Sequence, residues 1–358
     1  MKDGGLDFVT TPPQEDKGRK GEERGLDAVL EGLKGKTLVI TGGAGYVATN
    51  IVKALADTPC QVVRLDREGV EFPAVRGAFD LEDRRGDVRD ERVWPDLLRR
   101  GDVVFHLAGQ TSAYAAARDP AADFEINVRP VLALAAACSN LRRRPDVVFA
   151  GTVTEAGLTD RLPVDETHPD DPLTIYDLHK LAAERYLRHF AREGVLRACT
   201  LRLANVYGPG PKSGSADRGI LNRMIALALR GETLTLFGGG EWVRDYVYVG
   251  DVAAAFLYAA DGMDRLNAGH FLIGSGVGHT LAEAFSLVAE RAAAVTGRRV
   301  ALVKKDFPPG SHPMERRNFV ADTSRFRALT GWRAAIPLGK GIDLTIESYM
   351  RTEGKGDS

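Results

Sequence analysis

The chain has 358 residues, of which 44% are hydrophobic, and its 48 Lys and Arg residues nearly balance its 49 Asp and Glu residues. This length supports a sizeable core, and the near-neutral charge argues against a basic nucleic-acid-binding protein. The three cysteines lie far apart without metal-ligand spacing, and no apolar run approaches the roughly 18 residues of a membrane span, so we predict a cytoplasmic protein.

Both ends of the chain are predicted to lie outside the folded body. Residues 1–35 are rich in Gly, Pro and charges of both signs, which predicts a flexible extension with a short helix over residues 26–33. Residues 351–358 are expected to form a tail.

From Lys36 onward, short apolar strands alternate with helical patterns. Strands are predicted over residues 37–40, 61–65, 103–107, 147–149 and 198–203, and helices over residues 47–55, 123–140 and 174–193. This alternation is typical of a parallel sheet with helices on both faces, so the expected fold class is α/β, with a doubly wound Rossmann-type domain over residues 36–205.

The alternation loosens after residue 205. Gly- and Pro-rich loops, a helix near residues 221–230 and a strand over residues 233–237 predict a smaller C-terminal substrate-binding lobe over residues 206–350. Parts of residues 240–275 are expected to return to the first domain.

A glycine-rich turn follows the first strand and opens the first helix. Gly42, Gly45 and Ala48 have the three-residue spacing that lets a backbone approach a pyrophosphate at a helix N-terminus. The next strand ends at Asp66, whose carboxylate can accept ribose hydroxyls and repel a 2′-phosphate. The pattern predicts NAD as the cofactor, while Arg67 keeps NADP open as an alternative.

Tyr176 and Lys180 are four residues apart and therefore share one face of the predicted helix. This spacing also occurs by chance on solvated helices, but Thr152 lies just past a predicted strand and offers a hydroxyl toward the same cleft. A tyrosine has a pKa of about 10, so base chemistry near neutral pH needs a neighbouring positive charge. Lys180 and an oxidised nicotinamide would supply two.

These segments together resemble the extended short-chain dehydrogenase/reductase family, in its nucleotide-sugar epimerase/dehydratase branch, over about residues 36–349. Further matching segments are residues 86–88, 106–110, 127–128, 201–209 and 244–249. The resemblance implies that Thr152, Tyr176 and Lys180 form the catalytic triad. In the family the tyrosine exchanges a proton with a sugar hydroxyl, commonly at C4, and the Ser or Thr hydrogen-bonds the same oxygen.

The resemblance also implies the binding residues. Those for the dinucleotide are Gly42, Gly45, Tyr46, Val47, Asp66, Arg67, Asp87, Val88, Leu107, Ala108, Gln110, Asn127, Tyr176 and Lys180. Those for a nucleoside-diphosphate sugar are Thr152 at the sugar, Asn205 at an expected helix N-terminus, Arg244 and Arg316 at the phosphates, and Thr235 and Phe237 at the base. No metal is predicted, and a homodimer is expected to form through the helices at residues 123–140 and 174–193.

Several positions depart from the family pattern, and two of them bear directly on the chemistry. Val153 and Thr154 stand where dehydrating members carry Asp and Glu, and Thr154 also stands where decarboxylating members carry Glu. Glu155 is expected to point away if the segment stays extended, because successive strand side chains alternate. Dehydration and decarboxylation are thereby disfavoured.

The leading hypothesis is therefore an NAD-dependent epimerase of UDP- or dTDP-linked sugars, acting at C4 through a transient 4-keto intermediate. A reductase of a nucleotide-linked 4-keto-sugar that consumes NADPH or NADH is the first alternative. The second is a non-catalytic dinucleotide-binding regulator, against which the retention of all three triad residues argues.

Overall fold

The computed structural model describes residues 25–211 and 219–353, so most of the predicted extension and the last five residues of the tail lie outside it. Its centre is a seven-stranded sheet in which every neighbouring pair is parallel. The spatial order is β10 (Gly269–Ile273), β6 (Arg197–Leu203), β5 (Asp146–Thr152), β4 (Val103–His106), β1 (Thr37–Thr41), β2 (Gln61–Asp66) and β3 (Asp80–Arg85). The chain order reverses between β1 and β4, which is where open α/β sheets bind their ligands.

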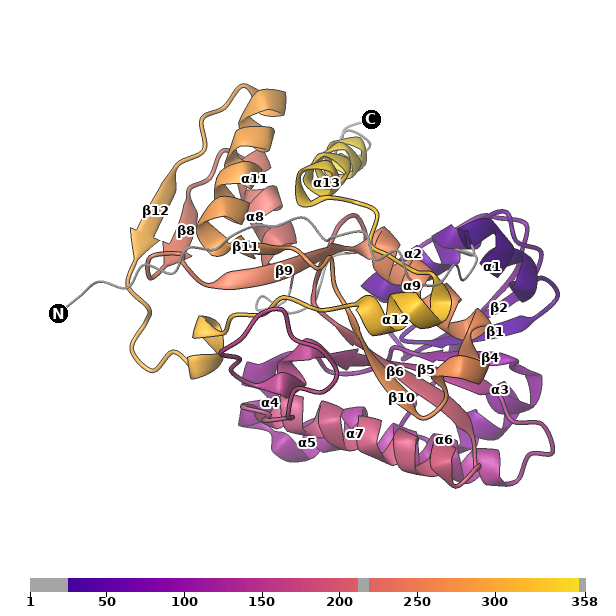
Figure 1. The fold of residues 1–358 in the computed structure, drawn as a ribbon. Helices are drawn as coiled ribbons and strands as arrows, with labels where there is room; N and C mark the ends of the chain where they lie inside the picture. The colour runs from indigo at the N-terminus through magenta and orange to yellow at the C-terminus, as the bar shows by residue number, and fades with distance from the viewer. Residues whose placement is uncertain (1–24, 212–218, 354–358) are drawn as a thin grey trace.

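Helices cover both faces of this sheet (Figure 1). On one side lie α1 (Leu26–Leu33), α2 (Tyr46–Ala54) and α9 (Val249–Asp261), and on the other lie α3 (Trp94–Arg100), α6 (Arg129–Ser139) and α7 (Ile175–Arg192). Leu38 and Ile40 pack on the first side and Val39 on the second, because successive strand residues alternate. The predicted Rossmann-type fold class is confirmed.

The second lobe has its own apolar core and lies beside the parallel sheet (Figure 1). It contains the sheet β11-β9-β7 and the pair β12-β8, packed against three helices. The bounds are β7 (Asn205–Tyr207), α8 (Ile220–Leu229), β8 (Leu234–Phe237), β9 (Val243–Tyr248), β11 (Gly278–Thr280), α11 (Leu281–Thr296), β12 (Leu302–Lys305) and α13 (Leu338–Glu353). Helix α9, strand β10 and helix α12 (Ser324–Thr330) pack with the first domain.

Three elements differ from the sequence-based expectations. The helix expected over residues 123–140 is two helices, α5 (Pro120–Asn127) and α6, that meet at Val128. Pro130 explains the break, because it lacks an N–H and its ring would collide with the carbonyl four residues earlier in a continuous helix. Strand β3 was not predicted, because its sequence is almost entirely charged. As an edge strand it needs little burial, and charge there discourages pairing with other chains.

The N-terminal helix is the third difference. Helix α1 occupies the residues expected for it, but Val29 and Leu33 are buried against α9 and the sheet core. From Leu26 onward the chain is therefore packed on the first domain instead of extending from it. Among the described helices, none is long and apolar enough to cross a membrane.

Candidate active site

The glycine-rich turn lies at the carboxyl end of β1, against the neighbouring strand ends. Gly42 has φ +67°, and a Cβ there would lie 2.9 Å from the Ala108 backbone nitrogen after β4. A Cβ on Gly45 would lie 2.8 Å from the Gly42 carbonyl oxygen. The turn can therefore form only with glycine at these two positions. Helix α2 begins at Tyr46 without a side-chain cap, so the N–H groups of its first turn remain available for an anion.

Tyr46 joins this turn to the second lobe. Its hydroxyl donates to the Gly208 carbonyl at 2.8 Å and accepts from Asn222 Nδ2 at 3.4 Å. Burial raises the pKa of Tyr46, so it stays a neutral hydrogen-bond donor. The side chain thus serves the contact between the lobes, and the backbone N–H groups of Tyr46 and Val47 belong to the uncapped first turn of α2.

The predicted adenosine end lies at the carboxyl ends of β2 and β3. Asp66 accepts from the Ala44 N–H at 3.0 Å and from the Arg67 N–H at 2.9 Å, which fixes the carboxylate beside the turn. The Arg67 side chain is exposed. Beyond β3, a hydrogen bond from Arg89 lowers the pKa of Asp87, and Val88 accepts from the buried Trp94 indole through its carbonyl.

A buried polar cluster holds the segment after β4. Gln110 Nε2 donates to Asp123 Oδ1 at 2.6 Å, and Asn127 Nδ2 donates to the same oxygen at 3.0 Å. His179 Nδ1 lies 2.7 Å from the other Asp123 oxygen, which ties this histidine of α7 to α5. Asn127 Oδ1 is buried near Gly109 without a hydrogen-bond partner among the described residues. The predicted cofactor residues Gln110 and Asn127 are thereby brought together with Leu107 and Ala108.

The three predicted catalytic residues lie where β5 ends and α7 begins. Thr152 is the last residue of β5, and Tyr176 and Lys180 face the sheet from the first two turns of α7, all three at most 6% exposed. The Lys180 ammonium lies 3.9 Å from the centre of the ring of Phe149, which precedes Thr152 on the same strand. The capping box that Thr174 forms with Asp177 fixes the start of α7.

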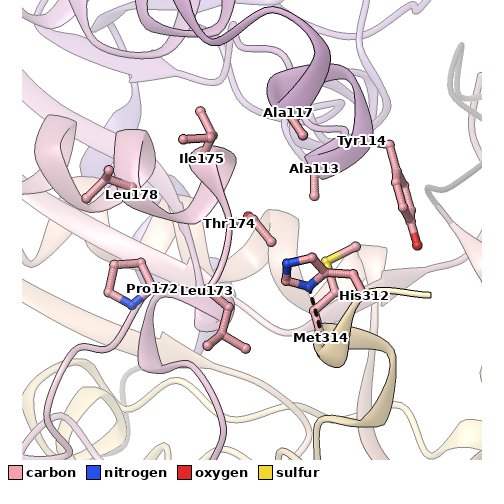
Figure 2. A pocket seen from close by; sticks show the side chains of 10 residues that line it. All are labelled: Ala113, Tyr114, Ala117, Pro172, Leu173, Thr174, Ile175, Leu178, His312 and Met314. Carbon is pink, nitrogen blue, oxygen red and sulfur yellow. Dashed lines mark hydrogen bonds between the residues drawn. The ribbon is translucent and has the colours of Figure 1, made fainter. Parts of the chain in front are cut away.

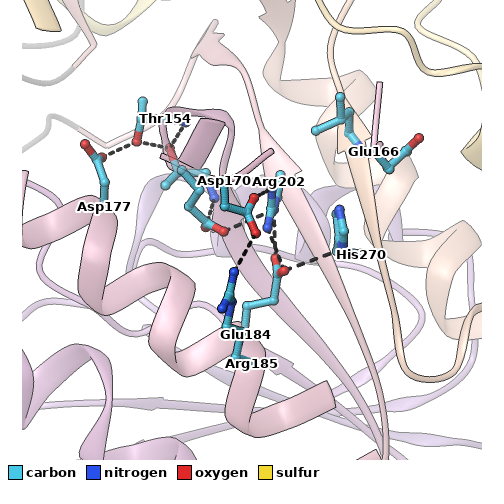
Figure 3. A network of polar contacts seen from close by, with 11 residues as sticks. Thr154, Glu166, Asp170, Asp177, Glu184, Arg185, Arg202 and His270 are labelled. Carbon is cyan, nitrogen blue, oxygen red and sulfur yellow. Dashed lines mark hydrogen bonds and ion pairs between the residues drawn. The ribbon is translucent and has the colours of Figure 1, made fainter. Parts of the chain in front are cut away.

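Next to Thr152 lies a buried ionic cluster that the sequence analysis did not identify (Figure 3). The Arg202 guanidinium is 2.6 Å from Asp170, 2.7 Å from Glu184 and 3.0 Å from Glu155. Glu155 Oε1 also accepts from the Thr152 N–H at 3.0 Å. Arg202 thus links the turn after β5 to α7, one helical turn beyond Lys180.

Glu155 does point away from the cleft, but for a reason other than the expected alternation. Residues Val153–Ala156 form a 3₁₀ turn, and this turn directs Glu155 into the ionic cluster. Burial, followed by repulsion from Glu184, raises the pKa of Glu155 well above its ordinary value. Burial alone would lower the pKa of Arg202, but the surrounding carboxylates of Glu155 and Glu184 outweigh it and raise that pKa.

The predicted diphosphate residues lie in the second lobe. Asn205 is the first residue of β7, so the prediction of a helix N-terminus was wrong; parallel pairing with β9 explains its strand conformation. Its amide donates to the Asp245 carbonyl at 3.3 Å. The neighbouring Arg244 is 7% exposed and donates to the Glu315 and Arg317 carbonyls, which fixes its guanidinium against that segment.

Of the two predicted base-binding residues, Phe237 belongs to an aromatic pair whose other member, Phe307, was not predicted. Phe237 is 40% exposed and stacks on Phe307 with ring centroids 6.1 Å apart. The Arg316 guanidinium lies 5.0 Å from the centre of the Phe307 ring on the same lobe. Thr235 is partly buried, two residues before Phe237 on β8. Phe307 lies in a Pro- and Gly-rich loop with no periodicity, so no sequence signal distinguished it.

A cavity of about 290 Å³ lies beside the start of α7 (Figure 2). Its walls come from α4 (Ala113–Arg118), residues 172–178 and the 3₁₀ turn at Pro313–Arg316. The side chains around it are mostly apolar, and Thr152, Tyr176 and Lys180 are not among them. The cavity is therefore adjacent to the triad and not formed by it. In the described part of the chain, no three His, Cys, Asp or Glu side chains gather as a metal site.

Comparison with known proteins identifies the family. The sequence of residues 38–274 matches the model of the NAD-dependent epimerase/dehydratase family. The chain belongs to this family. Membership confirms the predicted resemblance and NAD as the cofactor. The residues fit this cofactor, since Gly42 and Gly45 allow the tight turn that leads into the uncapped start of α2, and Asn127 keeps a buried oxygen that no described residue pairs with.

Individual epimerases of this family match over nearly their whole length. UDP-glucose 4-epimerase of Mycolicibacterium smegmatis is 28% identical over 319 residues, covering 87% of this chain and 97% of that protein. The enzyme of the same name from Azospirillum brasilense is 29% identical over 335 residues, covering 88% and 91%.

Solved epimerase structures have the same fold as this chain. UDP-glucose 4-epimerase from Thermotoga maritima with UDP-glucose has a TM-score of 0.78 and 31% identity, covering 88% of this chain and 99% of that one. The Thermus thermophilus enzyme in complex with NAD has a TM-score of 0.75 and 30% identity, with the same coverage.

Proposed function

We propose that this protein is an NAD-dependent epimerase of nucleoside-diphosphate sugars that inverts C4 through a transient 4-keto sugar. The observation that carries the proposal is the placement of Thr152, Tyr176 and Lys180. They lie buried at the carboxyl end of β5, on the same sheet edge as the glycine-rich turn. The similarity to UDP-glucose 4-epimerases supports a UDP-linked hexose as substrate.

Each residue of the triad has a distinct task in this proposal. Tyr176 takes the proton from the sugar hydroxyl and returns it to the oxygen when the hydroxyl re-forms. Lys180, held over the Phe149 ring, supplies positive charge that favours the phenolate, and Thr152 fixes the sugar oxygen. The glycine-rich turn and Asp66 would hold NAD, which would supply the site with an acceptor and donor for the hydride of the sugar carbon.

Substrate residues are proposed for the second lobe. Arg244 is held by backbone carbonyls of the segment that also carries Arg316, so the two cations stand on one structural support. A guanidinium suits a diphosphate because its planar fork pairs two oxygens. The exposed Phe237 and the partly buried Phe307 stacked on it offer an aromatic surface for the nucleobase. Thr154 has no carboxyl group, so it cannot act as the acid that dehydration or decarboxylation would need.

Two experiments test this proposal. Denaturing the purified protein without added cofactor should release nearly stoichiometric NAD⁺; an empty protein that binds added NADPH would support the 4-keto-sugar reductase instead. Tyr176→Phe should lower the rate of epimerisation by about 10²- to 10⁴-fold, the usual contribution of a general acid–base group. Turnover at the wild-type rate would remove Tyr176 from the mechanism.

We also propose a homodimer formed through α5, α6 and α7. Phe124 on α5 and Leu178 and Tyr186 on α7 are large apolar side chains that are 39%, 48% and 40% exposed. Because α5 and α7 contact each other, these exposed apolar side chains lie on neighbouring helices, which supports an interface there. Light scattering at micromolar concentration should give twice the chain mass, and a monomeric mass would contradict the proposal.

A further inference from the structure

A chain of hydrogen bonds runs from Thr152 into the first turn of α7. Thr152 Oγ1 lies 2.9 Å from Thr154 Oγ1 and also accepts from the Thr154 N–H at 3.3 Å. Thr154 Oγ1 donates in turn to Asp177 Oδ1, as Figure 3 shows. Asp177 is only 2% exposed, and its second oxygen accepts from the Thr174 N–H at 3.2 Å. This series of hydrogen bonds therefore ends on a buried carboxylate next to Tyr176.

The hydrogen bonds from Thr152 to Asp177 have only one possible order of donors and acceptors while Asp177 is ionised. An ionised carboxylate can only accept, so the Thr154 hydroxyl proton goes to Asp177. Because a hydroxyl has a single proton, the Thr154 oxygen must accept from Thr152. Thr152 Oγ1 then has its own proton engaged and one lone pair filled by the Thr154 N–H. One lone pair, and no proton, remains for a substrate.

We propose that Thr154 and Asp177 are positioning residues that make Thr152 a hydrogen-bond acceptor toward the substrate. The proposal rests on the proposed function, which brings the sugar oxygen to Thr152. A sugar hydroxyl can donate its one proton to the free lone pair of Thr152 until Tyr176 takes that proton, whereas a keto oxygen has no proton to donate. The arrangement therefore favours the bound alcohol over the bound keto sugar and leaves Tyr176 as the donor to the keto oxygen.

The test is the equilibrium on the enzyme, measured without following turnover. Holoenzyme is saturated with UDP-galactose, and the fraction of bound nicotinamide that is reduced is read from its near-ultraviolet absorbance. Thr154→Val frees the Thr152 proton for the keto oxygen, so the ratio of reduced to oxidised cofactor should rise by about 2- to 13-fold, the effect of one hydrogen bond. Thr154→Ala should give the same rise with a smaller side chain, should Thr154→Val fold poorly.

Two controls separate the direction of the hydrogen bonds from general damage. Thr154→Ser restores a hydroxyl and should return the ratio to the wild-type value. Thr296→Val removes a hydroxyl that binds the Ala292 carbonyl within α11 at 2.8 Å, and it should leave the ratio unchanged.

The outcomes distinguish this inference from the proposed function. A wild-type ratio in Thr154→Val and Thr154→Ala, with reduced cofactor present in every sample, would overturn the inference and leave the epimerase in place. Absence of both reduced cofactor and product in all samples, wild type included, would overturn the function and the inference with it.

Discussion

Arg202 is a buried cation that three carboxylates surround, and its removal should destabilise the fold strongly. Its side chain is 4% exposed, and Glu155 and Glu184 beside it are at most 1% exposed. Breaking a buried ion pair by removing one partner costs about 3 to 5 kcal/mol, because the remaining charge has no compensation. With an m-value of about 3 kcal/mol/M, Arg202→Met should lower the urea midpoint by about 1 to 1.7 M.

A matched control comes from the surface. Arg197 pairs with Asp146 and Asp264 at 2.9 Å and 2.7 Å, but its side chain is 40% exposed. Exposed ion pairs contribute at most about 1 kcal/mol each, so Arg197→Met should lose at most about 2 kcal/mol and lower the urea midpoint by about 0.7 M or less. Equal shifts in the two variants would refute the argument that burial makes Arg202 indispensable.

Removing the charge of Glu155 from the same ionic cluster should stabilise the fold, in contrast to removing Arg202. Because burial raises the pKa of Glu155, the folded state keeps a proton that the unfolded chain releases around the ordinary value of 4.5. Wild-type stability is therefore lost as pH rises from 4.5 through the folded-state pKa. Glu155→Gln lacks this loss. The difference between its free energy of unfolding and that of the wild type should therefore shift in favour of the variant as pH increases. Parallel stability curves across this range would show that Glu155 is fully compensated by Arg202.

Three further predictions concern the cofactor turn, a buried histidine and the aromatic surface. Gly42→Ala should abolish NAD retention, because its Cβ would lie 2.9 Å from a backbone nitrogen. Gly35 has a similar φ of +70° but nothing within 4 Å of an added Cβ, so Gly35→Ala should retain NAD. Equal NAD contents in the two variants would contradict this prediction. Burial lowers the pKa of His106 to about 3. The free energy of unfolding of the wild type should therefore decrease as the pH is lowered below 6.5, by up to about 1.4 kcal/mol per pH unit, and urea denaturation of His106→Gln should show no such decrease. Phe237→Ala should raise KM for the nucleotide sugar by about 2- to 13-fold, as loss of an aromatic contact would, with little change in the urea midpoint, and an unchanged KM would remove Phe237 from the base site.

Features with a local cause could be predicted from the sequence. The run Leu38-Val-Ile40 is buried on both faces of the sheet, and such strands are recognisable as continuous apolar segments. The glycine-rich turn and the Tyr176 and Lys180 pair depend only on short spacings and on the elements that flank them. These features were enough to predict the first domain and the candidate triad.

Features that depend on distant contacts could not be predicted in the same way. Arg202, Glu155 and Glu184 come from β6, the turn after β5 and α7, and their sequence separations carry no periodic signal. Strand β3 has a charged sequence and exists through its pairing with β2. Asn205 likewise takes its strand conformation from β9, which lies about 40 residues further along the chain.

The most direct test of the central claim follows the hydrogen at C4. The purified protein, with no added cofactor, is given UDP-glucose deuterated at C4, and the UDP-galactose formed is examined by mass spectrometry and proton NMR. The account predicts epimerised product that retains the deuterium at C4, because the hydride leaves and returns to the same carbon. Loss of deuterium to water, or product only when a reduced cofactor is added in stoichiometric amount, would contradict it.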